Sequence, residues 1–419
     1  MFYKEVLKNG LRIVCEEISH VTSVSIGVWV NVGSKNEKPE NNGISHFIEH
    51  MMFKGTPNRS AREVAATMDR VGGVLGAFTE REYTCYHAKV ISKYFPLAID
   101  LLSDMVLNSL FEKKEIAMEK QVVIEEIKMY EDTPDELIHD LFAKTIWNNH
   151  SLGQPIIGTS EVINSLNREV MVDFRDNMYH PEKIVISVAG NIKHQEVFEE
   201  IRKAFEGLEI SSSVLEEKAP QINPCIYNQK KDCEQMHLCI GTIGLPYTHE
   251  DRYTLYLLNN ILGGGMSSRL FYEIREKEGL AYAVYSYQAS FSPSGFFTTY
   301  LGTSPKNYHK AIKIVLDEFS KVKNKKIKGS ELNKAKENIK GNMMLSMENT
   351  SNRMSRIAKQ ELYFNKYFTI EETIERIEDV QAKDILDIAS YIFQEKYLTI
   401  AAIGPLSDQE CKVEISLFC

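Results

Sequence analysis

The sequence predicts an α+β fold made of two similar halves, each an α/β sandwich. Strand-rich and helix-rich stretches follow one another without strict β-α-β alternation, which is typical of this class. The same order of elements occurs twice along the 419 residues, a length too great for one ordinary hydrophobic core. Residues 211–224 interrupt the pattern with serines, charges and two prolines, and without apolar periodicity. We therefore predict a first domain of residues 1–210, a linker of residues 211–224 and a second domain of residues 225–419.

Five successive elements of the first half have counterparts in the second. Each half contains, in order, an apolar strand, a helix, a glycine-containing stretch that leads into strands, a long helix, and a closing helix and strand that end in glycine. In the first half they lie at residues 23–34, 43–53, 71–90, 96–111 and 170–190. In the second half they lie at residues 236–246, 252–262, 278–302, 308–322 and 385–404. This order predicts a duplicated domain, and chance similarity between two α+β domains is the alternative.

The charge and the N-terminal sequence bear on partners and location. The formal net charge is −9, whereas nucleic-acid binders carry basic patches, so we expect no nucleic-acid partner. The N-terminal sequence MFYKEVLKNGLRIVCEE lacks the features of a signal or transit peptide, and no later segment has the apolar length of a membrane span. We therefore expect a cytoplasmic protein without a membrane partner. A mature organellar protein whose leader had been removed would have the same sequence.

The cysteines do not indicate a metal cluster or a disulfide framework. The seven cysteines are scattered and none forms a C-x-x-C motif, which is typical of reduced thiols. Cys233, His237 and Cys239 resemble a ligand cluster in spacing alone. Their segment has the alternation of a strand, whose successive side chains point to opposite faces, and we therefore expect no metal there.

The segment Gly43–Phe53, GISHFIEHMMF, carries the strongest chemical signal. Four apolar residues recur at helical spacing and predict a buried stripe: Ile44, Phe47, Ile48 and Met51. His46 and His50, four residues apart, share another face of this helix and can bind one zinc ion together. Glu49, on the same side, can take a proton from water that zinc makes acidic. The alternative is a helix with two surface histidines and a glutamate in a salt bridge.

A third ligand is expected from the helix predicted at residues 112–132. Its apolar stripe consists of Ile116, Val123, Ile127 and Tyr130. Glu119 and Glu126 are seven residues apart and so share one face, and Glu126 lies partly on the buried side, where a carboxylate is rare unless paired or bound to a metal. Glu125 is rotated toward solvent and is the weaker candidate. A solvated acidic face is the alternative for this helix.

The set His46-x-x-Glu49-His50 followed by Glu126 resembles the pitrilysin and insulysin superfamily of inverted-motif zinc peptidases. The segments HFIEHMMFKGT and VVIEEI are similar to sequences of the mitochondrial-processing-peptidase branch and its bacterial relatives. The resemblance covers nearly the whole chain. It implies one Zn²⁺ per chain, with His46, His50 and Glu126 as its ligands and Glu49 as the general base. It also implies that Glu119 orients a zinc ligand.

Two features of the second half match the same superfamily. The sequence NNILGGGMSSRLF resembles its glycine-rich loop at Gly263, Gly264 and Gly265, which the resemblance implies to bind substrate. EIREKEGLAYAV places Arg275 and Tyr282 seven residues apart, similar to the Arg/Tyr pair that assists catalysis in these enzymes. A tight turn and a solvated helix end are the plain alternatives for these two features.

One stretch departs from the superfamily pattern. Its members usually have Asn-Ala-Phe-Thr on the strand that aligns substrate beside the metal, whereas this chain has Gly76, Ala77, Phe78 and Thr79. A glycine lacks the amide side chain, although the main-chain groups of the strand remain available to an extended peptide. We therefore expect these four residues to bind substrate with a looser orientation.

The resemblance implies a zinc-dependent endopeptidase of the processing-peptidase type. Its two halves would form a clamshell around a chamber in which extended peptides or presequence-like segments are cut, and the chain would pair as a homodimer. One rival is a non-catalytic assembly subunit, like the core proteins of respiratory complexes, which typically have degraded metal motifs. Another is one subunit of a heteromeric processing peptidase. The intact metal set favours an enzyme, and the presence of both the metal set and the Arg/Tyr pair favours a self-sufficient one.

Overall fold

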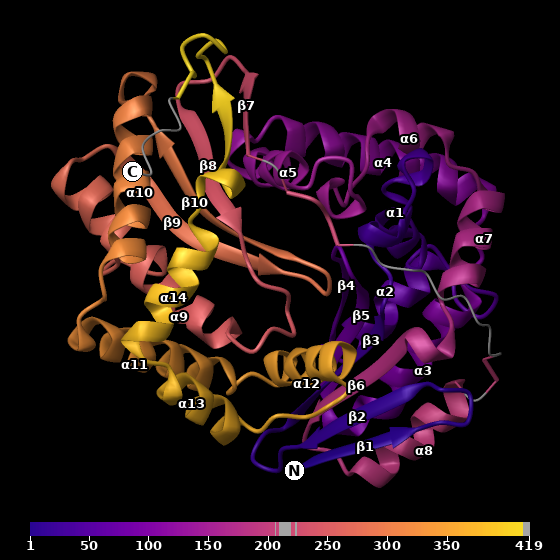
Figure 1. The fold of residues 1–419 in the computed structure, drawn as a ribbon. Coiled ribbons are helices and arrows are strands. Elements are labelled where there is room, and N and C mark those ends of the chain that lie inside the picture. The colour runs from indigo at the N-terminus through magenta and orange to yellow at the C-terminus, as the bar shows by residue number, and fades with distance from the viewer. Residues whose placement is uncertain (206, 209–218, 223, 414–419) are drawn as a thin grey trace. The chain divides into compact units, whose positions relative to one another are not determined.

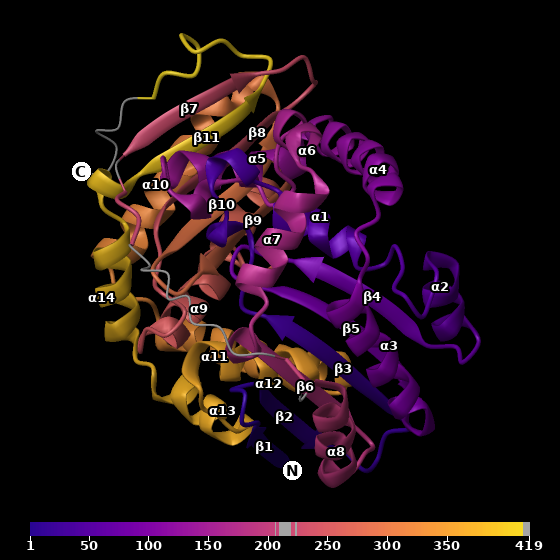
Figure 2. The ribbon, with the colours of Figure 1, turned by 90° about the vertical axis from the view of Figure 1, so that its right-hand side faces the viewer.

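The computed structural model describes residues 1–205, 207–208, 219–222 and 224–413, and these residues form two compact units, each with one mixed sheet and packed helices (Figures 1 and 2). The first unit comprises Met1–Lys128, Gln154–Glu216 and Met344–Tyr367. The second comprises Met129–Gly153, Glu217–Met343 and Phe368–Cys419. The predicted α+β class with two halves is confirmed. Most of the predicted linker, residues 211–218 and 223, lies outside the described residues.

The first unit is built on a six-stranded sheet with the order β1-β2-β6-β3-β5-β4. Its strands are β1 (Phe2–Val6), β2 (Arg12–Glu17), β3 (Ser23–Val30), β4 (Val74–Thr79), β5 (Thr84–Ile91) and β6 (Ile184–Gly190). Only β2 and β6 pair in parallel; the other pairs are antiparallel. Strand β4 is an edge strand, and its one neighbour among the described strands is β5.

Helices cover both faces of this sheet. The helices that belong mainly to the first unit are α1 (Ile44–Met51), α2 (Ala61–Asp69), α3 (Phe95–Asn108), α4 (Lys113–Glu131), α6 (Ser160–Ser165), α7 (Arg168–Met178), α8 (His194–Phe205) and α12 (Thr350–Phe364). The main core lies on one face, between the strands and helices such as α1, α3 and α8. On the other face, Met354, Ile357 and Ala358 of α12 pack against Val14 and Trp29.

The second unit repeats this plan with a five-stranded sheet of order β7-β11-β8-β10-β9. Its strands are β7 (Cys225–Lys230), β8 (Met236–Ile243), β9 (Ala281–Ser290), β10 (Gly295–Thr303) and β11 (Thr399–Gly404). Its helices are α5 (Pro134–Ile146), α9 (Arg252–Gly263), α10 (Tyr308–Asn324), α11 (Gly329–Ser346), α13 (Ile370–Asp379) and α14 (Ala382–Ile392). The main core is again on one face of the sheet, and α5 packs on the other.

The two sheets have the same strand order when corresponding strands are compared. β2, β6, β3, β5 and β4 match β7, β11, β8, β10 and β9 in order, and the parallel pair occupies the same place in each sheet. Gly190 and Gly404 end the corresponding strands β6 and β11. This shared topology supports duplication over chance similarity.

The compact units differ from the predicted domains at two helices. Helix α5, from the first half of the sequence, packs on β8 and β11 of the second unit, and α12, from the second half, packs on β3 and β6 of the first. Each sheet therefore has a second apolar face that a helix from the other half of the sequence covers. Periodicity predicts that a helix is amphipathic, but it does not specify which sheet receives the apolar face.

Two further observations concern the whole described chain. No single described helix is long and apolar enough to cross a membrane, although Ser92–Asn108 and Lys113–Glu131, bent by 100°, pass that test of length and composition together. The described cysteines, Cys15, Cys85, Cys225, Cys233, Cys239 and Cys411, are free. His237 and Cys239 share one face of β8 because they are two residues apart, so the prediction of opposite faces was wrong for this pair. Cys233 precedes that strand, and the one group of possible metal ligands found among the described residues lies elsewhere.

Candidate active site

Helix α1 holds the H-x-x-E-H motif against the core of the first unit. Its predicted apolar stripe is present, because Ile44, Phe47, Ile48 and Met51 are fully buried. Gly43, the residue before the helix, has φ +93°, and a Cβ there would lie 2.8 Å from the carbonyl oxygen of Ile157. Only glycine fits this conformation and space readily. His46, Glu49 and His50 consequently lie on the less buried side of the helix.

A buried carboxylate anchors the N-terminal end of α1. Glu37 accepts hydrogen bonds from the backbone N–H groups of Gly43 (2.7 Å) and Ser45 (2.8 Å) and from the side-chain amide of Asn42 (2.9 Å). These bonds occupy donors that the start of a helix leaves free. Burial raises the pKa of Glu37 to about 7, against the opposing effect of the hydrogen bonds from Gly43 and Ser45. Sequence reasoning missed Glu37, because no spacing rule links a loop residue to a helix start seven residues later.

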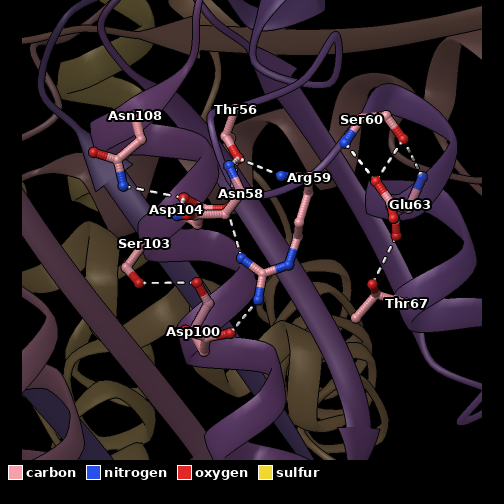
Figure 3. Close-up of polar contacts among 10 residues, drawn as sticks. All are labelled: Thr56, Asn58, Arg59, Ser60, Glu63, Thr67, Asp100, Ser103, Asp104 and Asn108. Atoms are coloured by element: carbon pink, nitrogen blue, oxygen red, sulfur yellow. Dashed lines mark hydrogen bonds and ion pairs between the residues drawn. The ribbon is translucent and has the colours of Figure 1, made fainter.

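The loop after α1 is tied to α3 through Asp104 (Figure 3). The carboxylate of Asp104, 5% exposed, accepts hydrogen bonds from Thr56 (2.8 Å), Asn58 (2.9 Å), Arg59 (2.5 Å) and Asn108 (3.0 Å). Burial raises the pKa of Asp104, but these bonds outweigh burial and the pKa lies below its usual value. The segment that leaves the motif helix is therefore fixed by polar contacts that the sequence pattern did not indicate.

His46, His50 and Glu126 form a group that can hold a metal ion, since one ligand atom from each lies within 4.8 Å of the others. Nε2 of His46 is 3.8 Å from Glu126, and Nε2 of His50 is 3.6 Å from it. Burial, with a further effect of His50, lowers the pKa of His46 to about 3, so this ring is neutral and able to bind a metal near pH 7. Two imidazoles and one carboxylate are a donor set that suits zinc and leaves a fourth position open.

Glu119 orients one of these imidazoles. Nδ1 of His50 donates a 2.9 Å hydrogen bond to Glu119, so Nε2 is the atom directed toward Glu126. Glu119 is 5% exposed and also pairs with Lys54. Burial raises the pKa of Glu119, but the bonds from His50 and Lys54 outweigh burial and lower it. A carboxylate behind a ligand histidine is the usual arrangement in zinc sites.

The two adjacent glutamates of α4 point in different directions. The side chain of Glu126 is 36% exposed and faces both histidines. The side chain of Glu125 is 72% exposed and pairs with Lys128 at 2.7 Å. This is the difference in helical phase expected from the sequence.

Glu49 lies beside the ligand group without belonging to it. The hydroxyl group of Thr79, at the end of β4, donates a 2.5 Å hydrogen bond to Glu49. Burial raises the pKa of Glu49, while the bond from Thr79 and the neighbouring His50 oppose that increase. A carboxylate with a raised pKa beside a metal position can accept and return a proton near neutral pH.

The residues expected to align substrate lie on the edge strand β4. Ala77 packs toward the main core that contains α1, and Phe78 packs against the smaller cluster on the opposite face of the sheet. Gly76 is therefore on the Phe78 face, and Thr79 reaches Glu49 on the α1 face.

Arg275 and Tyr282 meet in the second unit. Arg275 lies in a π-helical segment, Phe271–Lys277, and Tyr282 lies in β9. The guanidinium carbon of Arg275 is 4.7 Å from the ring centroid of Tyr282, a cation–π contact, and Tyr282 is 81% exposed. The structure thus places an accessible phenol and a cation together.

The glycine-rich segment has a packing explanation at two of its three positions. A Cβ on Gly263 would lie 2.3 Å from the backbone nitrogen of Ser286, and one on Gly264 would lie 2.6 Å from Cα of Asn260. Gly265 faces open space. The close packing of α9 therefore accounts for Gly263 and Gly264 without a substrate.

Comparison with known proteins agrees with this geometry. Residues 12–160 match the Insulinase (Peptidase family M16) family, and residues 165–339 match the Peptidase M16 inactive domain family. The uncharacterized zinc protease YmxG of Bacillus subtilis is 44% identical over 97% of this chain and 98% of its own length. An uncharacterized zinc protease of Streptomyces coelicolor is 38% identical over 97% of this chain and 90% of its own length.

Solved structures show the same fold. A protease from Helicobacter pylori is 26% identical, with a TM-score of 0.90 over 97% of this chain and 99% of its own. A peptidase M16 inactive domain from Pseudomonas fluorescens is 18% identical, with a TM-score of 0.91 over 97% of this chain and 98% of its own, and this likeness concerns the fold alone. With the inverted motif on α1, the adjacent carboxylate of Glu126 on α4 and full-length relatives named zinc proteases, this chain belongs to peptidase family M16, the pitrilysin-like zinc proteases.

Proposed function

We propose that this chain is a zinc-dependent endopeptidase that holds one zinc ion through His46, His50 and Glu126. The observation that supports the proposal most directly is the convergence of these three side chains from α1 and α4 beside a half-buried Glu49. The hydrogen bond from His50 to Glu119 accounts for the orientation of one ligand.

Zinc bound there would supply a Lewis acid for amide hydrolysis. Glu49 accepts one proton from the attacking water, whose oxygen bonds to the scissile carbonyl carbon. Glu49 then returns this proton to the amide nitrogen as the C–N bond breaks, which leaves a carboxylic acid and an amine. The second proton of the water remains on the acid, which passes it to the amine at neutral pH. The hydroxyl group of Thr79 holds the carboxylate of Glu49 in place during both transfers.

We further propose that an extended peptide or presequence-like segment binds alongside β4, at Gly76–Thr79, by main-chain hydrogen bonds. The support is that no described strand pairs with the outer edge of β4, and strand addition at a free edge is a common mode of peptide binding. Arg275 and Tyr282 would donate to the negative charge that develops on the carbonyl oxygen. In this proposal the two halves close around a chamber.

The remaining expectations belong to the same proposal. The enzyme acts as a homodimer in the cytoplasm, without nucleic-acid or membrane partners, on peptide substrates. A 48 kDa species alone in light scattering at micromolar concentration would contradict the dimer. The rival of a non-catalytic assembly subunit is disfavoured because the ligand set and Glu49 are intact.

The test is cleavage of a peptide mixture by the zinc-loaded protein, with cut sites identified by mass spectrometry. Glu49→Gln is the matched inactive variant, because it removes the proton acceptor and keeps the shape and the ligands. We expect the wild type to cleave peptides and the variant to cleave them about 10²- to 10⁴-fold more slowly. Both proteins should contain the same amount of zinc. Equal cleavage by both proteins would remove Glu49 from the mechanism, and no cleavage by the wild type would favour the assembly subunit.

A further inference from the structure

An imidazole lies across the glycine of the edge strand in the first unit. His87 of β5 is the direct cross-strand partner of Gly76 of β4. A Cβ built on Gly76 would be 3.1 Å from both Cε1 and Nε2 of the His87 ring. The tip of the ring is therefore directed over the position that a side chain at residue 76 would occupy.

The surroundings of His87 leave its ring available. His87 and Gly76 are both partly exposed. Neither ring nitrogen of His87 has a hydrogen-bond partner among the residues that the structure describes. Phe78, on the same face of β4, has its ring centroid 5.9 Å from that of His87. The rings of His87 and Phe78 thus lie together on the Gly76 face of β4 and β5, and the imidazole has no hydrogen-bond partner among the described residues.

Gly76 and Phe78 lie on β4, the strand that also contacts the candidate base Glu49. Gly76 is three residues before Thr79, which donates its hydrogen bond to Glu49. A peptide strand added to the free edge of β4 has one residue directly opposite Gly76, and side chains of directly paired residues share a face of the sheet. That peptide side chain would lie above Gly76 and next to the His87 ring.

We propose that Gly76, His87 and Phe78 form a subsite for one aromatic side chain of the peptide substrate, about three residues from the bond that is cut. This inference rests on the proposed function, because it assumes that substrate pairs with β4. An aromatic residue opposite an edge glycine covers the exposed backbone. It also reaches the neighbouring ring at the centroid distances that favour aromatic pairs.

A neutral His87 ring is compatible with a flat, apolar substrate side chain in this subsite. Burial lowers the pKa of His87, so the ring is neutral near pH 7 and does not attract a carboxylate. The absence of a side chain at Gly76 leaves room for the His87 ring to lie across β4, and the rings of His87 and Phe78 supply the contact. In this proposal Gly76 does more than replace the Asn that is usual at this position in the superfamily, because it lets the His87 ring form part of the subsite.

The test uses a peptide that the wild-type enzyme cuts at one bond, with Phe or Ser placed in turn at each position within four residues of that bond. We expect one position at which Phe raises kcat/KM several-fold over Ser, mainly through KM. His87→Ala should reduce this ratio several-fold. Gly76→Ala should reduce it too, because the added Cβ fills the space and displaces the ring. Lys89→Ala is the matched control, because Lys89 is two residues from His87 on the same face of β5. The ratio of kcat/KM for the Phe peptide to that for the Ser peptide should be the same in this variant as in the wild type.

A binding experiment keeps the subsite testable if cleavage is slow or absent. The Kd values of the Phe and Ser peptides are measured by fluorescence anisotropy with Glu49→Gln and with Glu49→Gln/His87→Ala. Tighter binding of the Phe peptide that is lost in the double variant supports the subsite. Cleavage by the wild type without a positional preference, or an equal preference after His87→Ala, would overturn the subsite and leave the peptidase proposal intact. If the wild type does not cleave the peptide but the Phe peptide still binds more tightly than the Ser peptide, the result contradicts the peptidase proposal and leaves the subsite proposal intact.

Discussion

The hydroxyl group of Thr79 donates a 2.5 Å hydrogen bond to the carboxylate of Glu49, and so links the edge strand β4 to the motif helix α1. This bond favours the ionised carboxylate and opposes the increase in the Glu49 pKa that burial causes. Thr79→Val should therefore raise the pKa of Glu49, and the acid limb of the kcat/KM profile should move to higher pH. Thr79→Ser, which keeps the hydroxyl group, is the control. Identical acid limbs for Thr79→Val and the wild type would contradict this role.

Zinc affinity should distinguish the adjacent glutamates of α4. Glu126→Gln should lower zinc occupancy sharply, because an amide is a much poorer ligand than a carboxylate. Glu125→Gln is the matched control, since Glu125 is exposed and pairs with Lys128. Metal content by mass spectrometry and competition with a chelator measure the difference. Equal zinc loss from both variants would refute the assignment of Glu126.

The contact between Glu119 and His50 should also affect the metal. Glu119→Gln is expected to weaken zinc binding by about 10- to 100-fold, because an orienting carboxylate raises the basicity of its histidine. Titration of the zinc-free protein with a competing zinc indicator measures this loss. Unchanged affinity would mean that packing alone orients His50.

The pair Arg275 and Tyr282 should contribute to catalysis without contributing to zinc binding. Arg275→Ala and Tyr282→Phe are each expected to lower kcat/KM by about 10²-fold, the usual effect of removing a donor to developing charge. Tyr272→Phe, at another exposed tyrosine near this segment, should be near wild type. If both variants retain wild-type rates and zinc content, the pair has no catalytic role.

Glu37 should make the stability of the zinc-free protein depend on pH. Its pKa of about 7 in the folded protein exceeds the ordinary value of 4.5, so the folded state holds a proton that the unfolded state releases. The stabilisation is present below pH 4.5 and is lost as the pH rises through 7. The free energy of unfolding of the wild type, relative to Glu37→Gln, should fall by about 3 kcal/mol between pH 4.5 and pH 8.

Urea denaturation across this pH range, with a chelator present, measures the effect of Glu37. Glu40→Gln is the control, because Glu40 lies in the same loop and is exposed. If the difference between the wild type and Glu37→Gln does not change with pH, folding does not raise the pKa of Glu37.

The sequence by itself determined the features that depend on local spacing. The apolar stripe of α1 and the four-residue interval between His46 and His50 place both imidazoles on one helix face, because 3.6 residues make one turn. The same reasoning separated Glu126 from Glu125 on α4. The repeated order of elements predicted two halves, and the two sheets have matching strand orders.

Only the tertiary structure decided which distant residues meet. Glu37 at the start of α1, Asp104 behind the following loop and His87 over Gly76 come from segments whose sequence patterns do not refer to one another. The sequence patterns also did not indicate that α5 packs on the sheet of the second unit and α12 on the sheet of the first. A periodic pattern reports which face of an element is apolar, whereas the partner of that face depends on how the whole chain closes its cores.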